Sequence, residues 1–241
     1  MVGFTDQAKH QYDLSALFTI NSVSGATSRT YDITGFQPGV RLPAVTFLKA
    51  PGFMDGHAGY SDPLLEQHFI VQVVNTVMTS KYWKDTAIIV LYDDSDGWYD
   101  HVYPPLVNAS ALSALPSSSD ALTGTGQCGV ALAGAVLGRC GYGPRQPFLV
   151  ISPFARRNYV DHTVTDQTSV LRFIEDNFGL GRIDAAPGKS VAEGGSFDQI
   201  AGSLNSAFDF DEDQDGWHGW HGEREPRRLI LDANTGQPVH W

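Results

Sequence analysis

Three short apolar runs, each bounded by polar residues or by proline and glycine, stand out in the hydrophobic pattern of the chain. They cover residues 42–48, 87–92 and 147–153. Short runs of apolar and β-branched residues between turn signals are typical of strands buried on both faces, as in a parallel sheet. We therefore predict strands over residues 43–48, 87–92 and 147–153.

Two other segments have the periodicity of amphipathic helices. Residues 63–80 begin with Pro63, which suits a first helical turn, and place apolar side chains four positions apart, at Leu65, Phe69, Val73 and Val77. Residues 166–178 carry apolar side chains along one side and end before Gly179, a residue type that commonly stops helices. We predict a helix over each segment.

The order of these elements predicts an α/β fold. A helix between strands 43–48 and 87–92 forms a right-handed crossover, which makes the two strands parallel neighbours in one sheet. Two helices are too few to cover both faces of such a sheet, so we expect the sheet to be incomplete in this chain. We expect residues 1–241 to belong to one domain, with an irregular start at 1–40, a core at 41–180 and a loop-rich tail at 181–241.

The remaining segments are weakly patterned. Residues 12–18 predict a short helix, and the Ser-, Thr- and Gly-rich residues 22–39 predict a loop. Residues 104–146 form a long irregular insert, of the kind that is usually functional or mobile. Residues 228–232 predict either a short closing strand or an extended arm.

Composition excludes some classes of partner. The chain has 241 residues, 42% of them hydrophobic, with 16 Lys and Arg against 27 Asp and Glu, for a net charge of −11. This acidic balance argues against nucleic acid or an anionic membrane as a bulk partner. No apolar run is long enough to span a bilayer, and the first residues lack the basic start and apolar core of a signal peptide.

The two cysteines leave the redox environment open. Cys128 and Cys140 flank a Gly-rich loop. A disulfide between them fits an exported protein, and two buried thiols fit a cytosolic one.

The second apolar run stops at two adjacent carboxylates, Asp93 and Asp94, and Asp96, Asp100 and His101 follow closely. Ligand crevices in open α/β sheets lie outside the carboxyl ends of the strands. Carboxylates this crowded repel one another unless a cation neutralises them. The pattern therefore predicts either a cation site or an ordinary solvated acidic turn.

A histidine follows the first apolar run in a loop with a specified backbone path. His57 lies between Gly56 and Ala58, in a segment rich in glycine and proline. Loops after strands carry function more often than packing roles do, so His57 is a candidate site residue as well as an ordinary surface residue.

The sequence shows no sign of an activated nucleophile. It has no Gly-x-Ser-x-Gly pattern between a strand and a helix, and neither cysteine has an evident paired base. We therefore expect this chain to be the C-terminal part of a longer enzyme, whose N-terminal half supplies the missing groups.

Five stretches resemble one family of proteins. The most specific is Tyr-Asp-Asp-Ser-Asp-Gly-Trp-Tyr-Asp-His-Val at residues 92–102. The others lie at residues 42–60, 138–145, 150–162 and 166–177. Together they resemble the bacterial phosphoesterase family that unites acid phosphatases with phospholipases C.

The resemblance implies an alkaline-phosphatase-like α/β sandwich with a mainly parallel central sheet. It also implies that Asp93 and Asp94 bind one divalent metal ion, such as Ca²⁺, Mg²⁺ or Mn²⁺, near the phosphoryl group. His57 matches the histidine that contacts the phosphoryl oxygens or the leaving group. The nucleophilic hydroxyl and a further Glu-Asn metal-binding pair belong to the N-terminal half of the family domain, and we expect His162 to be structural.

Three functions follow as expectations. The His57 loop resembles the acid phosphatase branch, which predicts a metal-dependent phosphomonoesterase acting on a small phosphoester. The alternatives are a phospholipase C, for which the partner is membrane lipid, and a non-catalytic fragment that binds metal or phosphate, or packs against a separate N-terminal half. The family favours a periplasmic or secreted full-length protein and a Cys128–Cys140 disulfide, while the acidic charge balance argues against nucleic acid as a partner.

Overall fold

The computed structural model describes residues 12–24, 29–95, 98, 100–102, 142–183, 196–210 and 228–239. The chain divides into two units, residues 1–88 with 220–241, and residues 89–219. Each unit is described below by itself. Cys128 and Cys140 lie outside the described residues.

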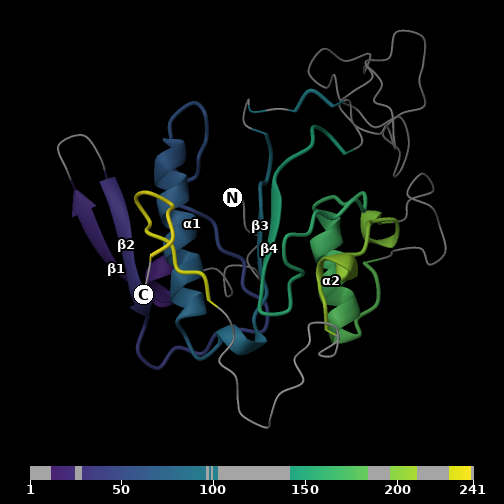
Figure 1. Ribbon diagram of the computed structural model, residues 1–241, viewed down its shortest axis with the longest axis horizontal. Coiled ribbons are helices and arrows are strands. Elements are labelled where there is room, and N and C mark those ends of the chain that lie inside the picture. Colours follow the sequence, from purple (N-terminus) through teal and green to yellow (C-terminus); the bar gives the residue numbers. More distant parts are fainter. Residues whose placement is uncertain are drawn as a thin grey trace. The chain divides into compact units, whose positions relative to one another are not determined.

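An antiparallel hairpin opens the first unit. Strands β1 (Phe18–Ser24) and β2 (Arg29–Phe36) pair with Phe18 opposite Phe36, and the register shifts between Thr19 and Ile20 (Figure 1). The prediction of a loop over 22–39 is therefore wrong. Threonine, valine, isoleucine and tyrosine favour strands, and the Ser- and Gly-rich composition hid the alternation of these residues.

The predicted helix over 12–18 is reduced to one 3₁₀ turn, η2 (Leu14–Ala16). The Asp13 carboxylate caps it by accepting a hydrogen bond from the Ser15 N–H at 2.8 Å. Phe18 leaves the turn to start β1 because it packs fully buried in the core, where its ring stacks on Phe36 with centroids 5.3 Å apart.

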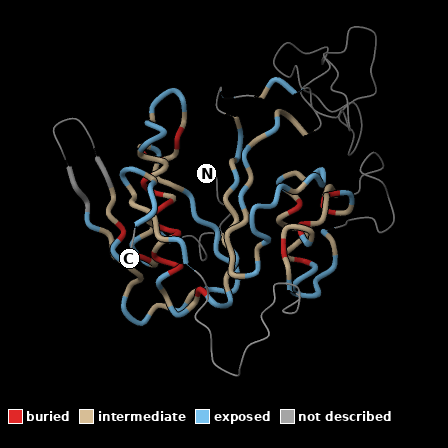
Figure 2. Tube along the Cα trace, viewed as in Figure 1, coloured by how far each residue is buried: buried red, intermediate tan, exposed pale blue. Residues whose placement is uncertain are grey.

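Helix α1 (Pro63–Met78) confirms the predicted helix and packs against the hairpin. Asp62 caps its start, accepting a hydrogen bond from the Leu64 N–H at 2.8 Å, and Pro63 stands in the first turn. Buried positions lie along this helix (Figure 2), and the core of the unit joins Phe18, Ile33, Met54, Phe69 and Val73. No helix among the described residues is long and apolar enough to cross a membrane.

Residues 42–48 do not form the predicted strand. Phe47 is 82% exposed, and Val45 and Leu48 are also exposed. A strand needs a neighbouring strand to satisfy its backbone N–H and C=O groups, and none pairs with this segment in the described part of the chain. The predicted parallel crossover through α1 is wrong for the same reason.

The other two predicted strands are confirmed, as a small sheet. Strand β3 (Ile88–Leu91) begins at the boundary of the two units and pairs with β4 (Phe148–Ile151). The described residues thus give a mixed α/β structure with two two-stranded sheets, and the expected mainly parallel central sheet is not seen among them.

Helix α2 (Thr168–Phe178) follows β4 in the second unit. It ends at Gly179, whose φ of 64° is left-handed, as the sequence predicted. The ring of Phe173, on this helix, stacks on the ring of Phe208, with centroids 5.1 Å apart.

The arm formed by residues 228–239 belongs to the first unit and lies against α1. The side chain of Asn75 donates to the Leu231 carbonyl at 2.6 Å and accepts from the Leu231 N–H at 3.3 Å. Leu231 also bridges to Pro238 within the arm. Of the two predicted outcomes for 228–232, the extended arm is the one observed.

Candidate functional site

The loop that carries His57 is built around the carboxylate of Asp55. One carboxylate oxygen accepts a hydrogen bond from the His57 N–H at 3.2 Å, and the other accepts from the Tyr60 hydroxyl at 3.1 Å. The Ser61 hydroxyl accepts from the Gly56 N–H at 3.1 Å. With Met54 fully buried beneath it, the loop has a defined shape just ahead of α1.

Two neighbours orient the imidazole of His57. The Gly59 N–H donates to Nδ1 at 3.0 Å, so the neutral ring carries its proton on Nε2. The ring of Tyr60 stacks on the imidazole, with centroids 4.0 Å apart and planes 22° apart. His57 is partly exposed, and its Nε2–H can therefore serve as a proton donor to a bound molecule.

Gly56 is required by its surroundings as well as by its backbone. Its φ is +77°, and a Cβ built there would lie 2.7 Å from Cδ of Glu66 in the first turn of α1. A side chain at this position would be strained and would displace Glu66.

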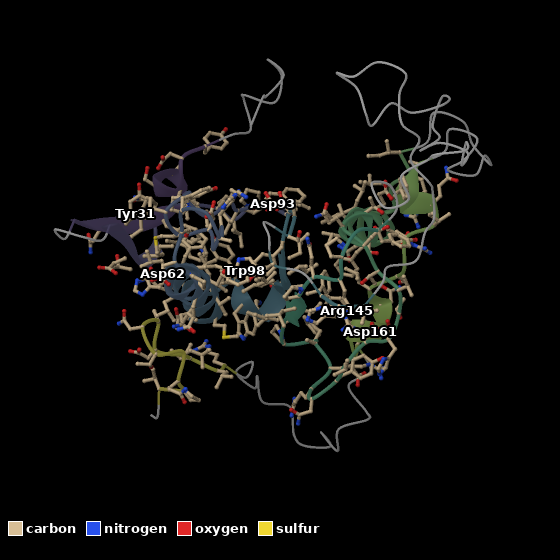
Figure 3. The ribbon with its side chains drawn as sticks, turned by 90° about the horizontal axis from the view of Figure 1, so that it is seen from above. Tyr31, Asp62, Asp93, Trp98, Arg145 and Asp161 are labelled. Carbon is tan, nitrogen blue, oxygen red and sulfur yellow. The ribbon has the colours of Figure 1, made fainter. Side chains whose placement is uncertain are left out.

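Asp93, which is labelled in Figure 3, and Asp94 follow Tyr92, the first residue after β3. Both aspartates are exposed. The side-chain amide of Gln167 donates to the Tyr92 carbonyl at 2.9 Å and to the Asp93 carbonyl at 2.7 Å. The backbone that carries the two carboxylates is thereby tied to the start of α2.

The donor set of this turn suits a hard divalent cation in part. Two adjacent carboxylates supply oxygen ligands of the kind that Ca²⁺, Mg²⁺ and Mn²⁺ prefer. Within the part of the chain that the structure describes, no group of three or more His, Cys, Asp or Glu side chains could hold a metal ion. Metal binding by Asp93 and Asp94 stays a prediction, and Asp96 lies outside the described residues.

Asp100 is engaged in an ion pair. Its carboxylate accepts from the Val102 N–H at 3.0 Å and from Nε of Arg145 at 2.5 Å. The Val102 hydrogen bond first, and the Arg145 contact next, hold the pKa of Asp100 below its ordinary value. Asp100 thus anchors the end of the acidic stretch to Arg145.

His57 belongs to the first unit, and Asp93 and Asp94 belong to the second. Their convergence on one substrate stays a prediction. His162, which we expected to be structural, is exposed next to Asp161.

Sequence reasoning missed the residues that hold these groups in place. Asp55 and Tyr60 lie two and three positions from His57. An acid and an aromatic this close to a loop histidine were the available signal that the histidine is held in place by its neighbours. Gln167 lies 74 positions from Asp93, and no local pattern connects the two.

Comparison with known proteins identifies the family of the chain. The profile of the phosphoesterase family matches residues 9–181. The chain belongs to the phosphoesterase family.

Several relatives of this chain are named as phospholipases C. It is 31% identical over 173 residues to the non-hemolytic phospholipase C of Pseudomonas aeruginosa, an alignment covering 70% of this chain and 24% of that protein. It is 32% identical over 182 residues to the non-hemolytic phospholipase C of Burkholderia pseudomallei, covering 73% and 24%. Phospholipase C B of Mycobacterium tuberculosis is 29% identical over 171 residues, covering 70% and 30%.

The chain therefore spans about a quarter of the length of the first two relatives. The names of the relatives favour the phospholipase C alternative over the acid phosphatase branch that the His57 loop suggested.

Proposed function

We propose that this chain contributes the metal-binding turn and a proton-donating histidine to a phosphoester hydrolase of the phospholipase C type. The observation that carries the proposal is the exposed Asp93–Asp94 pair at the end of β3, on a backbone held by Gln167. The substrate class is a phosphatidylcholine-type lipid, in keeping with the named relatives.

The chemistry follows from the charges. A phosphoester is anionic, and a divalent cation, when bound, offsets charge on its non-bridging oxygens. Asp93 and Asp94 would hold that ion through hard oxygen ligands. Nε2–H of His57 would donate to a phosphoryl oxygen or to the leaving oxygen, while Gly59 keeps the tautomer that allows this.

The finer architecture is part of the same proposal. We infer that β3 and β4 belong to a mainly parallel sheet of the alkaline-phosphatase type, which the N-terminal half of the family domain would complete. That half would also supply the nucleophile and further metal ligands. We propose a periplasmic or secreted location for the whole protein.

Calorimetry and turnover test the proposal together. Ca²⁺, Mg²⁺ and Mn²⁺ are titrated into the longest natural reading frame that contains this chain, which would supply the further ligands, and into its Asp93→Asn and Asp94→Asn variants. We expect one divalent ion to bind the wild type, and each variant to lose that binding. A wild type that binds no divalent ion, or variants that bind it equally well, would overturn the ligand assignment.

Turnover is measured on the chain and on the longest natural reading frame that contains it. Release of phosphocholine from phosphatidylcholine vesicles is compared with hydrolysis of p-nitrophenyl phosphate. Preference for the lipid supports the phospholipase C assignment, and preference for the phosphomonoester supports the acid phosphatase branch. Metal binding without turnover in either protein would mean a non-catalytic, metal-binding role.

A further inference from the structure

Gln167 stands immediately before α2 but does not cap the helix. Its backbone is helical, with φ −60° and ψ −29°, and its side chain makes no capping hydrogen bond. Asp166 does that work instead, because its carboxylate accepts from the Thr168 N–H at 2.7 Å and from the Thr168 hydroxyl at 2.5 Å. The side chain of Gln167 is thereby left to act elsewhere.

The place where it acts is the turn after β3. A primary amide has two N–H groups on one nitrogen, and Nε2 of Gln167 reaches both the Tyr92 carbonyl, at 2.9 Å, and the Asp93 carbonyl, at 2.7 Å. Both carbonyls lie past Leu91, the last residue of β3. The amide therefore gives partners to two backbone acceptors just beyond the strand ladder.

Those two carbonyls set the direction of the carboxylates. One belongs to the peptide that enters Asp93, and the other to the peptide that joins Asp93 to Asp94. Fixing the two peptide planes that flank Asp93 fixes the Cα–Cβ direction of that aspartate, and it also fixes the peptide plane that leads into Asp94. Both aspartates are exposed. Two like charges on neighbouring residues favour divergent conformers unless the backbone opposes this.

We propose that Gln167 is a positioning residue, which holds the Asp93–Asp94 turn in the conformation that binds a divalent cation. This inference rests on the proposed function, because it takes those carboxylates as metal ligands. Gln167 acts through the backbone and contacts neither metal nor substrate. Residues that orient metal ligands in this way typically change metal affinity by about 10- to 100-fold when they are lost.

The matched test uses Gln167→Met, which keeps the length of the side chain and removes both N–H donors. The control is Gln199→Met, at a partly exposed glutamine in the same unit, in the 3₁₀ turn η5 (Phe197–Gln199). Mn²⁺ affinity is measured by calorimetry in the longest natural reading frame that contains this chain, and the free energy of unfolding is measured by urea titration. We expect Gln167→Met to bind Mn²⁺ about 10- to 100-fold more weakly, and Gln199→Met to bind it as the wild type does.

Backbone NMR shifts add a readout that does not depend on metal. In the metal-free protein, we expect the carbonyl resonances of Tyr92 and Asp93 to shift in Gln167→Met, because both carbonyls lose a hydrogen bond. Should Gln167→Met fold poorly, Gln167→Asn serves in its place, because its shorter side chain does not reach the two carbonyls.

The outcomes separate this inference from the proposed function. If the wild type binds Mn²⁺ through Asp93 and Asp94, and Gln167→Met binds it equally well, the positioning role is overturned and the metal site stands. If Gln167→Met loses stability and affinity is unchanged in the folded fraction, Gln167 only fastens α2 and the inference fails. If the wild type does not bind Mn²⁺, the metal-site assignment and the positioning role of Gln167 both fail.

Discussion

The imidazole of His57 lies face to face with the ring of Tyr60, with centroids 4.0 Å apart. The Tyr60 hydroxyl donates to Asp55, and Asp55 also accepts from the His57 N–H. Together with the hydrogen bond from Gly59 to Nδ1, these contacts hold the histidine in one orientation and one tautomer. The loop therefore fixes the imidazole of His57, which we propose as the proton donor.

Removing the stack should loosen the histidine. Tyr60→Ala should broaden or shift the His57 ring resonances in long-range ¹H–¹⁵N NMR spectra, because the imidazole gains rotamers. Tyr60→Phe keeps the stacked ring and loses only the hydroxyl bond to Asp55, so its His57 spectrum should change less. Tyr159→Ala, at a half-exposed tyrosine of the other unit, is the control and should leave His57 unchanged. Identical His57 spectra in wild type and Tyr60→Ala would contradict this role of Tyr60.

Gly56 and Gly39 form a matched pair that separates two costs of adding a side chain: backbone strain at positive φ, and contact with a neighbouring side chain. Both have φ of +77°, but a Cβ on Gly39 would meet nothing within 4 Å, whereas one on Gly56 would run into Glu66. We expect Gly39→Ala to lower the free energy of unfolding by about 1–2 kcal/mol. Gly56→Ala should cost only slightly more, because the atoms that its Cβ meets are the flexible carboxyl end of Glu66, which can shift. Urea unfolding measures both, and equal losses would show that Glu66 moves aside freely.

Asn75 fastens the arm of residues 228–239 to α1 through two hydrogen bonds to Leu231. Asn75→Ala should lower the free energy of unfolding by about 1–3 kcal/mol, since two backbone groups lose their partner. It should also speed amide exchange at Leu231. Asn234→Ala is the control, because Asn234 is exposed on the same arm and its N–H, which alanine retains, makes the bond to Asp232. Unchanged exchange at Leu231 in Asn75→Ala would contradict the anchoring role.

Asp161 should make the second unit sensitive to acid. Burial acts to raise its pKa, but hydrogen bonds from the Ser206 hydroxyl and the Thr163 N–H outweigh it and leave the pKa of Asp161 below its ordinary value. Because the folded-state pKa is lowered, the stabilisation is present above the unfolded pKa of about 3.9 and is lost as pH falls through the lower folded value.

The Asp161→Asn variant tests this dependence. It should be less stable than wild type at pH 7 by about 1–2 kcal/mol. That difference should shrink as the pH falls below about 3.9, where the carboxylate of the unfolded chain takes up a proton, and it should vanish once the folded carboxylate, whose pKa is lower, is protonated as well. Ser206→Ala, which removes one donor, should show a smaller loss with the same pH trend. Urea unfolding at several pH values measures both, and a difference that is constant with pH would contradict the assignment.

Some of the fold follows from local pattern. Pro63 and Asp62 predicted the start of α1, Gly179 predicted the end of α2, and two apolar runs predicted β3 and β4. Helix caps and stops depend on residues adjacent in sequence, so they can be recognised without knowing the tertiary structure.

The errors came from segments whose state depends on a partner. Residues 42–48 have the composition of a strand but lie without a strand partner in the described part of the chain, and Phe47 is exposed. Residues 22–39 resemble a loop in composition, but many of them belong to β1 and β2, because Phe18 and Ile33 of these strands are buried in one core with Phe69 and Val73 of α1. Strand formation requires cross-strand pairing, which propensity alone does not provide.

The sequence by itself determined the family, the two helices, two short strands and the candidate residues His57, Asp93 and Asp94. Each of these depends on neighbours within a few positions along the chain. Only the tertiary structure decided which side chains hold the candidates in place. Gln167 reaches Asp93 across 74 positions and Asn75 reaches Leu231 across 156, because such hydrogen bonds exist only once packing has brought distant segments together.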